Sequence, residues 1–278
     1  MLRRRTLLGR LGGLAGGLCL VPGATPAAAS GPASMPVARR IVSVGGAVTE
    51  TLYALGAQAE IVGVDTTSLY PAEARRLPSV GYARQLSAEG VLSLRPTLLI
   101  ASAEAGPPAV LRQLEAARVP VQVLDADHRI DGLVQRTRRI GERVGRAEAG
   151  AAIAAAIERD WAATQARVAA LRGAPPRVLF VLSHAMNQVR IGGSGTAADA
   201  VIRLAGARNA FGDVSGFKPL TPEAAIAAAP DILLATDQGL QAAGGVDGLL
   251  AAPGLAATPA GRARRVAAFD ALLLLGFR

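Results

Sequence analysis

Short hydrophobic runs alternate with helical patterns along most of the chain. In the first half, runs rich in Val, Ile and Leu predict strands at residues 40–44, 61–65, 97–101 and 119–124. Apolar positions with helical spacing predict helices between them, at residues 48–55, 87–94 and 109–117. This alternation of strands and helices is typical of an α/β fold with mainly parallel strands.

The second half repeats this plan. It contains predicted strands at residues 177–182, 231–236 and 265–269, and a helix at 196–204 that follows a glycine-rich turn. Residues 86–101 align without gaps to residues 220–235, and each copy places Ser or Thr, then Glu, a short apolar helix, Pro and a strand in the same order. We therefore expect two related Rossmann-like lobes.

The segment between the halves predicts a stiff connection. Residues 130–171 contain no proline and few glycines, and apolar positions alternate there with Arg and Glu. We expect one long helix, or two helices broken near residues 141–150; a helix of about 25 residues would be roughly 37 Å long. The predicted organisation is an N-terminal lobe at 30–129, a connecting helix at 130–172 and a C-terminal lobe at 173–278.

The first 29 residues are typical of a signal peptide. Arginines come first, and the apolar stretch at 11–21 is shorter than the roughly 20 residues that span a bilayer. An A-x-A site at 27–29 predicts cleavage before Ser30, and the paired arginines also resemble a twin-arginine signal. Since Cys19 is the only cysteine, the mature chain would lack disulfides and thiolate sites. We expect an exported, periplasmic protein that does not itself span the membrane.

Composition excludes several classes of function. The net charge is +9, and removal of the four leader arginines leaves +5, without any dense basic run that would indicate nucleic-acid binding. The only lysine, Lys218, is not part of a phosphate-binding loop, and Ser183 and His184 are not set in a G-x-S-x-G turn. We expect no enzyme, although an exported α/β enzyme of unknown reaction stays an open alternative.

The remaining chemistry indicates a ligand cleft. Ligands of open α/β sheets bind beyond the carboxyl ends of the strands. His184 follows a predicted strand of the second lobe, whereas Tyr82 lies in a glycine-containing loop of the first. Both residue types ligate iron in haem proteins, and His128, past the strand that ends at Leu124, could reach the same cleft.

Several motifs resemble one family. The sequence IVSVGGAVTE at residues 41–50 is similar to the opening of many periplasmic iron-complex and cobalamin binding proteins. The sequence VGYARQLSAEG at 80–90 resembles the haem-binding branch of that family more narrowly. Further motifs of that branch lie at residues 182–184, 192–193, 196–200, 253–255 and 258–261. The resemblance extends from about residue 40 to the C-terminus.

The resemblance implies that haem is the transported ligand. Tyr82 would be the axial iron ligand, and His184 would contact a second haem or the open face of the first. Arg84 would lie near the haem and could pair with a propionate. Glu89 and Glu223, which are equivalent in the internal repeat, would dock onto arginines of an ABC importer permease.

The resemblance leaves alternative functions open, and the sequence differs from the family pattern in one respect. A carrier of the same fold for a ferric siderophore or cobalamin, and a haem sensor or scavenger that never docks, both stay open. The family usually continues through a last helix of the second lobe, which this sequence lacks. We therefore expect exposed apolar surface near residues 272–275.

Overall fold

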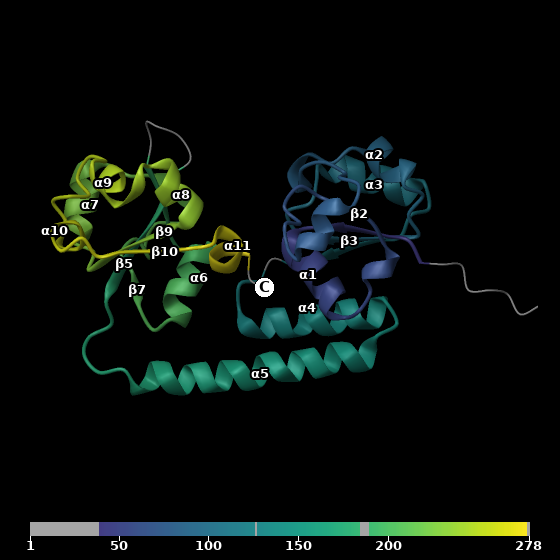
Figure 1. The fold of residues 1–278 in the computed structure, drawn as a ribbon, viewed down its shortest axis with the longest axis horizontal. Helices are drawn as coiled ribbons and strands as arrows, with labels where there is room; N and C mark the ends of the chain where they lie inside the picture. Colours follow the sequence, from purple (N-terminus) through teal and green to yellow (C-terminus); the bar gives the residue numbers. More distant parts are fainter. Residues whose placement is uncertain (1–38, 126, 184–188, 277–278) are drawn as a thin grey trace, which may run out of the picture. The chain divides into compact units, whose positions relative to one another are not determined.

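The computed structural model describes residues 39–125, 127–183 and 189–276. The predicted signal peptide and His184 lie outside this range. The described residues form two α/β units, which two successive helices link along the chain (Figure 1). The predicted fold class is confirmed, because each unit is built on a sheet with parallel strands.

The N-terminal lobe contains a parallel sheet with the strand order β2-β1-β3-β4. Its strands are β1 (Ile41–Val44), β2 (Ile61–Val64), β3 (Leu98–Ser102) and β4 (Val121–Leu124). Its α-helices are α1 (Gly46–Ala54), α2 (Ala88–Ser93) and α3 (Pro108–Ala116), with short 3₁₀ turns η1 (Gln58–Glu60), η2 (Ala72–Arg76) and η3 (Ala83–Gln85). Strands β1 and β3, in the centre of the sheet, are almost completely buried and mostly apolar, as expected for strands that are covered on both faces.

The C-terminal lobe has a mixed sheet in the order β10-β9-β5-β6-β8, with β7 paired to one end of β5. The strands are β5 (Arg177–Ser183), β6 (Val189–Gly192), β7 (Arg208–Asn209), β8 (Phe217–Pro219), β9 (Ile232–Thr236) and β10 (Val266–Phe269). The helices are α6 (Ala197–Leu204), α7 (Pro222–Ala228), α8 (Asp237–Ala242), α9 (Gly245–Leu250), α10 (Pro259–Arg262) and α11 (Ala271–Leu275). Strands β6 and β8 pair in antiparallel fashion and were not predicted, because glycine and proline interrupt their hydrophobic alternation.

The internal repeat extends to the backbone. Ser87 caps α2 through a hydrogen bond from Gly90 N, and Thr221 caps α7 through one from Ala224 N. Arg95 and Ala229, which occupy the same place before the proline in each copy, both have positive φ, at 47° and 43°. Non-glycine residues rarely adopt this conformation. The two copies therefore share their helix start, their helix end and the following parallel strand.

The connecting segment is a pair of helices. Helix α4 (Ile130–Arg143) is followed by α5 (Ala147–Ala170), whose 24 residues correspond to about 36 Å. The chain turns between them through Gly145 at φ 71°. Helices α4 and α5 approach closely at Gly141 and Gly150, since a Cβ added to Gly150 would lie 3.2 Å from the Gly141 Cα. Of the two arrangements that the sequence allowed, the described residues adopt the broken one.

Helix α5 touches both lobes. Near its start, Ala149 and Ile153 pack against the core that β1, β3 and α1 share with α4. Near its end, Val168 lies so close to Gly206, in the loop after α6, that a Cβ there would meet its side chain at 2.5 Å. The helix thus packs against the N-terminal lobe with one half and against the C-terminal lobe with the other. The lobe boundaries at residues 129 and 172 remain predictions.

The leucines near the end of the described chain form α11 rather than a uniformly exposed surface. Asp270 caps this helix through hydrogen bonds from Leu272 N and Leu273 N. Leu274 is only 4% exposed and belongs to a core with Phe180 and Ile202, whereas Leu273 is 59% exposed. The expectation of exposure was therefore wrong for Leu274, because α11 packs against α6. Across the described residues, no helix combines the length and hydrophobicity needed to cross a bilayer.

The two neighbouring leucines make a stability prediction. We expect Leu274→Ala to lower the free energy of unfolding by about 2–4 kcal/mol, because it removes buried side-chain volume from the core. Leu273→Ala, on the same helix, should change it by less than about 0.5 kcal/mol. Urea denaturation followed by circular dichroism measures both, and equal effects would contradict the burial of Leu274.

Candidate functional site

A cavity of about 330 Å³, hereafter the Tyr82 cleft, lies at the carboxyl edge of the N-terminal sheet. Each of the four parallel strands contributes the residues that follow it. The cavity is lined by 45–48 after β1, Thr67 after β2, 102–104 at the end of β3 and residues 124, 125, 127 and 128 at the end of β4, as well as by Tyr82 and parts of α4 and α11. The location agrees with the general position of ligand sites in open α/β sheets.

A buried carboxylate, Asp65, supports two of the loops that line this cleft. Asp65 is nearly inaccessible and accepts hydrogen bonds from Gly45 N at 2.8 Å and from Thr67 N at 2.9 Å. The hydroxyls of Thr67 and Ser68 donate to the same carboxylate at 2.6 and 2.8 Å. A buried charge is tolerated when hydrogen bonds satisfy it in this way. Asp65 therefore ties the loop after β2 to the turn between β1 and α1.

Tyr82 stands at the mouth of the cleft on an anchored loop. It precedes η3, and its neighbours Ala83 and Leu86 are buried in the core beneath the sheet. Gly106 N donates to Ala83 O at 2.9 Å, and Leu86 N donates to Gly106 O at 2.8 Å, so two backbone hydrogen bonds join this loop to the loop after β3. The Tyr82 side chain itself is 41% exposed. An accessible phenol on a rigid support is suited to contact a ligand.

Arg84 faces an acidic partner across these two loops. Its Nη2 lies 2.7 Å from Glu104 Oε1. The hydrogen bond to Glu104 raises the pKa of the Arg84 guanidinium above its usual value, a hydrogen bond to Tyr82 acts in the same direction, and partial burial acts against both. Tyr82, Arg84 and Glu104 therefore form one polar group at the rim of the cleft.

The opposite wall comes from α4 and α11. Arg136 of α4 donates to Asp127 O at 2.6 Å, and partial burial lowers the pKa of its guanidinium, while the charges of Asp127 and Asp125 act in the opposite direction. His128 lines the cleft, as the sequence suggested, and Leu272 and Leu275 of α11 add apolar surface. The cleft thus combines apolar walls with charged groups near Tyr82.

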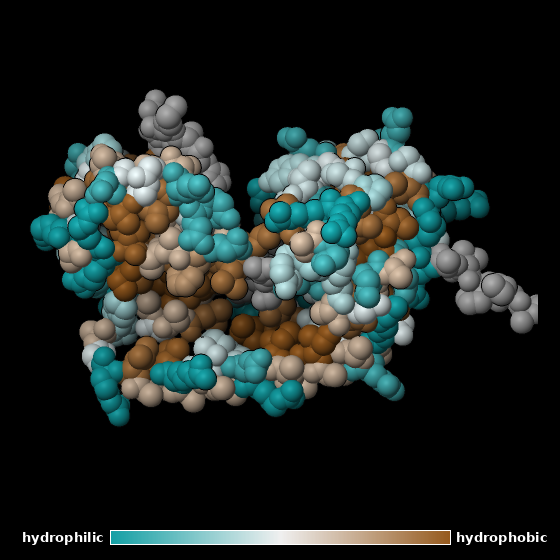
Figure 2. Space-filling model, viewed as in Figure 1, coloured by the Kyte–Doolittle hydropathy of each residue, from teal (hydrophilic) through white to brown (hydrophobic). Residues whose placement is uncertain are grey.

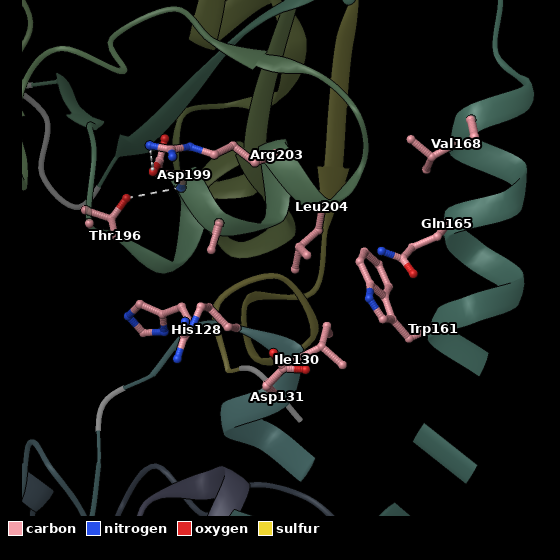
Figure 3. A pocket seen from close by; sticks show the side chains of 14 residues that line it. His128, Ile130, Asp131, Trp161, Gln165, Val168, Thr196, Asp199, Arg203 and Leu204 are labelled. Carbon is pink, nitrogen blue, oxygen red and sulfur yellow. Dashed lines mark hydrogen bonds and ion pairs between the residues drawn. The ribbon is translucent and has the colours of Figure 1, made fainter. Parts of the chain in front are cut away.

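A second cavity, of about 700 Å³, lies between α5, α6 and the start of α4 (Figure 3). Trp161 and Val168 of α5 and Leu204 of α6 form its apolar walls, and Figure 2 shows hydrophobic surface around a hollow beside α5. Two of its charged groups are paired with each other, because Asp199 lies 2.6 Å from Arg203, and Asp199 also accepts a hydrogen bond from Asn209 at 2.9 Å. Although this cavity is larger, we place the candidate site in the Tyr82 cleft, where accessible polar groups converge.

The other predicted residues fall into two groups. Glu89 and Glu223 are exposed in the first turns of α2 and α7 and line neither cavity, so they are available on the surface. His184 lies outside the described residues, so its role remains a prediction. In the described part of the chain, no group of three or more His, Cys, Asp or Glu gathers in a way that could hold a metal ion.

Sequence reasoning missed Glu104 and Asp65. Asp65 directly follows β2, and Glu104 lies two residues past the end of β3. The rule that ligands bind beyond the carboxyl ends of parallel strands marks such positions as candidates. The predicted strand ends therefore marked the loop that carries Glu104 as a candidate. They could not show that Glu104 pairs with Arg84.

Comparisons with known proteins identify the family to which the chain belongs. The sequence profile of the periplasmic binding protein family matches residues 41–272, so the chain belongs to that family. The structure resembles the periplasmic haem-binding protein BhuT in complex with two haems, at 50% identity and a TM-score of 0.83, over 86% of this chain and 92% of that chain. It also resembles the apo form of the periplasmic haem-binding protein RhuT from Roseiflexus sp. RS-1, at 45% identity and a TM-score of 0.82, over the same shares of each chain.

Curated relatives are more distant. A cobalamin-binding protein of Halobacterium salinarum is 30% identical over 200 residues, which are 70% of this chain and 53% of the relative. The chain spans between about half and two thirds of the length of the curated relatives that it matches first.

The Asp65 network makes a prediction. Asp65→Asn would turn one acceptor oxygen into a donor that faces other donors, so we expect a loss of about 2–3 kcal/mol in the free energy of unfolding. Asp213→Asn, at an exposed position, is the matched control and should change it by less than about 0.5 kcal/mol. Chemical denaturation compares the two, and a neutral Asp65→Asn would contradict a structural role for the carboxylate.

Proposed function

We propose that this member of the periplasmic binding protein family captures haem in the Tyr82 cleft and delivers it to an ABC importer. The observation that carries the proposal is Tyr82 itself, an accessible phenol at the mouth of a cleft in a chain that is 45–50% identical to two haem-binding proteins of known structure. Tyrosine binds ferric haem iron as its phenolate. The work of the chain is to bind and release its ligand in the periplasm.

Each polar group near Tyr82 has a proposed role. Arg84, beside the phenol, pairs with a haem propionate, since guanidinium and carboxylate groups match in charge and geometry. The apolar surface of Leu272 and Leu275 contacts the porphyrin. His184 contacts a second haem or the open face of the first; this role comes from the resemblance of its motif.

Delivery requires contact with a permease, and we assign this role to Glu89 and Glu223. Both are exposed, both occupy the second position of a short helix, and the internal repeat makes them equivalent. A permease with two-fold symmetry can present the same arginine-bearing surface to each lobe. The proposal needs one acidic contact with the permease from each lobe.

Cobalamin is the second candidate ligand, because a cobalamin-binding protein is among the relatives. A cobalamin carrier would not depend on a tyrosine ligand, and a ferric-siderophore carrier would not either. An enzymatic role has no support, since the family and the solved neighbours are binding proteins of transport systems.

The Tyr82 ligand is tested by absorbance titration of the mature chain with hemin. We expect a saturable Soret band with tyrosinate charge-transfer features, and the end point counts the haems. Tyr82→Phe keeps the ring but removes the ligand oxygen, so it should abolish the charge-transfer features and weaken binding by at least about tenfold.

Tyr70→Phe is the matched control, since Tyr70 is another exposed tyrosine of the same lobe and does not line the cleft. It should bind hemin as the original chain does. A flat hemin titration of folded protein, together with saturable binding of cobalamin, would replace haem by cobalamin as the ligand.

If Glu89 and Glu223 dock onto the permease, changing them should impair haem uptake by cells without changing the affinity of the protein for hemin. We expect Glu89→Lys with Glu223→Lys to leave hemin binding in solution unchanged, because neither residue lines the cleft. Haem-dependent growth of cells that carry the importer should be lost, since each reversal sets a lysine against an arginine. Glu115→Lys, an exposed change on α3, should leave growth intact. Normal growth of the double variant would favour a sensor or scavenger.

A further inference from the structure

We infer that Glu104 competes with the ligand for Arg84, so that a carboxylate of the incoming ligand displaces Glu104 when it binds. The inference rests on the proposed function and adds a requirement to it. The cleft would favour a tetrapyrrole that carries free carboxylates over the same ring without them.

The geometry places the three groups in competition. Glu104 lines the cleft together with Tyr82, and its Oε1 lies 2.7 Å from Nη2 of Arg84. Tyr82 also lies near enough to raise the pKa of the Arg84 guanidinium. A ligand whose iron is held by Tyr82 therefore brings its own substituents to the place where Glu104 now contacts the guanidinium.

The existing pair is easily exchanged. The side chains of Arg84 and Glu104 are 56% and 59% exposed, and ion pairs in such positions contribute little to stability. The loops beneath them are joined by backbone hydrogen bonds between Ala83, Leu86 and Gly106, so Glu104 can leave Arg84 without moving the loops. The exchange is limited to side-chain rotation.

Charge provides the driving force. When Tyr82 binds ferric iron as phenolate, that oxygen, the Glu104 carboxylate and the ligand carboxylate all lie near the Arg84 guanidinium. Negative groups that share one cation repel each other, and water weakens this repulsion only in part. Glu104 thus weakens the binding of a carboxylated ligand, which eases its later release to the permease.

The test compares hemin with hemin dimethyl ester, which lacks free carboxylates, in titrations of the mature chain and its Glu104→Gln variant. Glutamine keeps the size of the side chain and removes its charge. We expect Glu104→Gln to bind hemin about two- to fivefold more tightly, and to gain clearly less affinity for the dimethyl ester, which has no carboxylate for Glu104 to repel. The gain for hemin should shrink as salt is added.

Glu115→Gln removes an exposed carboxylate on the same lobe, outside the cleft, and should change neither affinity. Weaker hemin binding by Glu104→Gln would overturn the inference, since Glu104 would then support Arg84. Equal changes for hemin and its ester, or no change, would overturn it too. If the original chain binds neither hemin nor the ester, the proposed function itself fails.

Discussion

The parallel pairing of β1 through β4 is the constraint on which the candidate site depends. Strands that run in one direction end at one edge of the sheet, so the loops after all four of them meet there. Gly45, Thr67, Glu104 and His128 are far apart in the sequence, yet they line the same cleft for this reason. The crossover helices that parallel strands require then cover the faces of the sheet and leave that edge accessible.

The polar groups near this edge of the sheet differ in burial: Asp65 is buried, whereas Arg84 and Glu104 are exposed. Asp65 accepts hydrogen bonds from two backbone amides and two hydroxyls, which ties together two of the loops that line the cleft. Arg84 and Glu104 lie at the surface, where solvent weakens their attraction. A firm support with exchangeable charges at its rim is suited to a protein that must both hold and release an anionic ligand.

The second lobe uses the same plan with one addition. The order β7-β5-β9-β10 corresponds to β2-β1-β3-β4, and the antiparallel strands β6 and β8 extend the sheet beyond it. Helix α5 packs against both lobes along its length, so the lobes are joined by a folded element and not by a flexible linker. The duplication also gives Glu89 and Glu223 matching positions, one on each lobe.

Local patterns in the sequence were sufficient for most of the parallel strands, the helix caps at Ser87 and Thr221 and the internal repeat. These features depend on neighbours along the chain, and therefore a pattern can report them. Only the tertiary structure decided that Glu104 meets Arg84, that Leu274 is buried whereas Leu273 is exposed, and that α11 reaches the cleft. These contacts join segments separated by whole helices and strands, and they arise when the sheets and helices pack, which no spacing along the chain encodes.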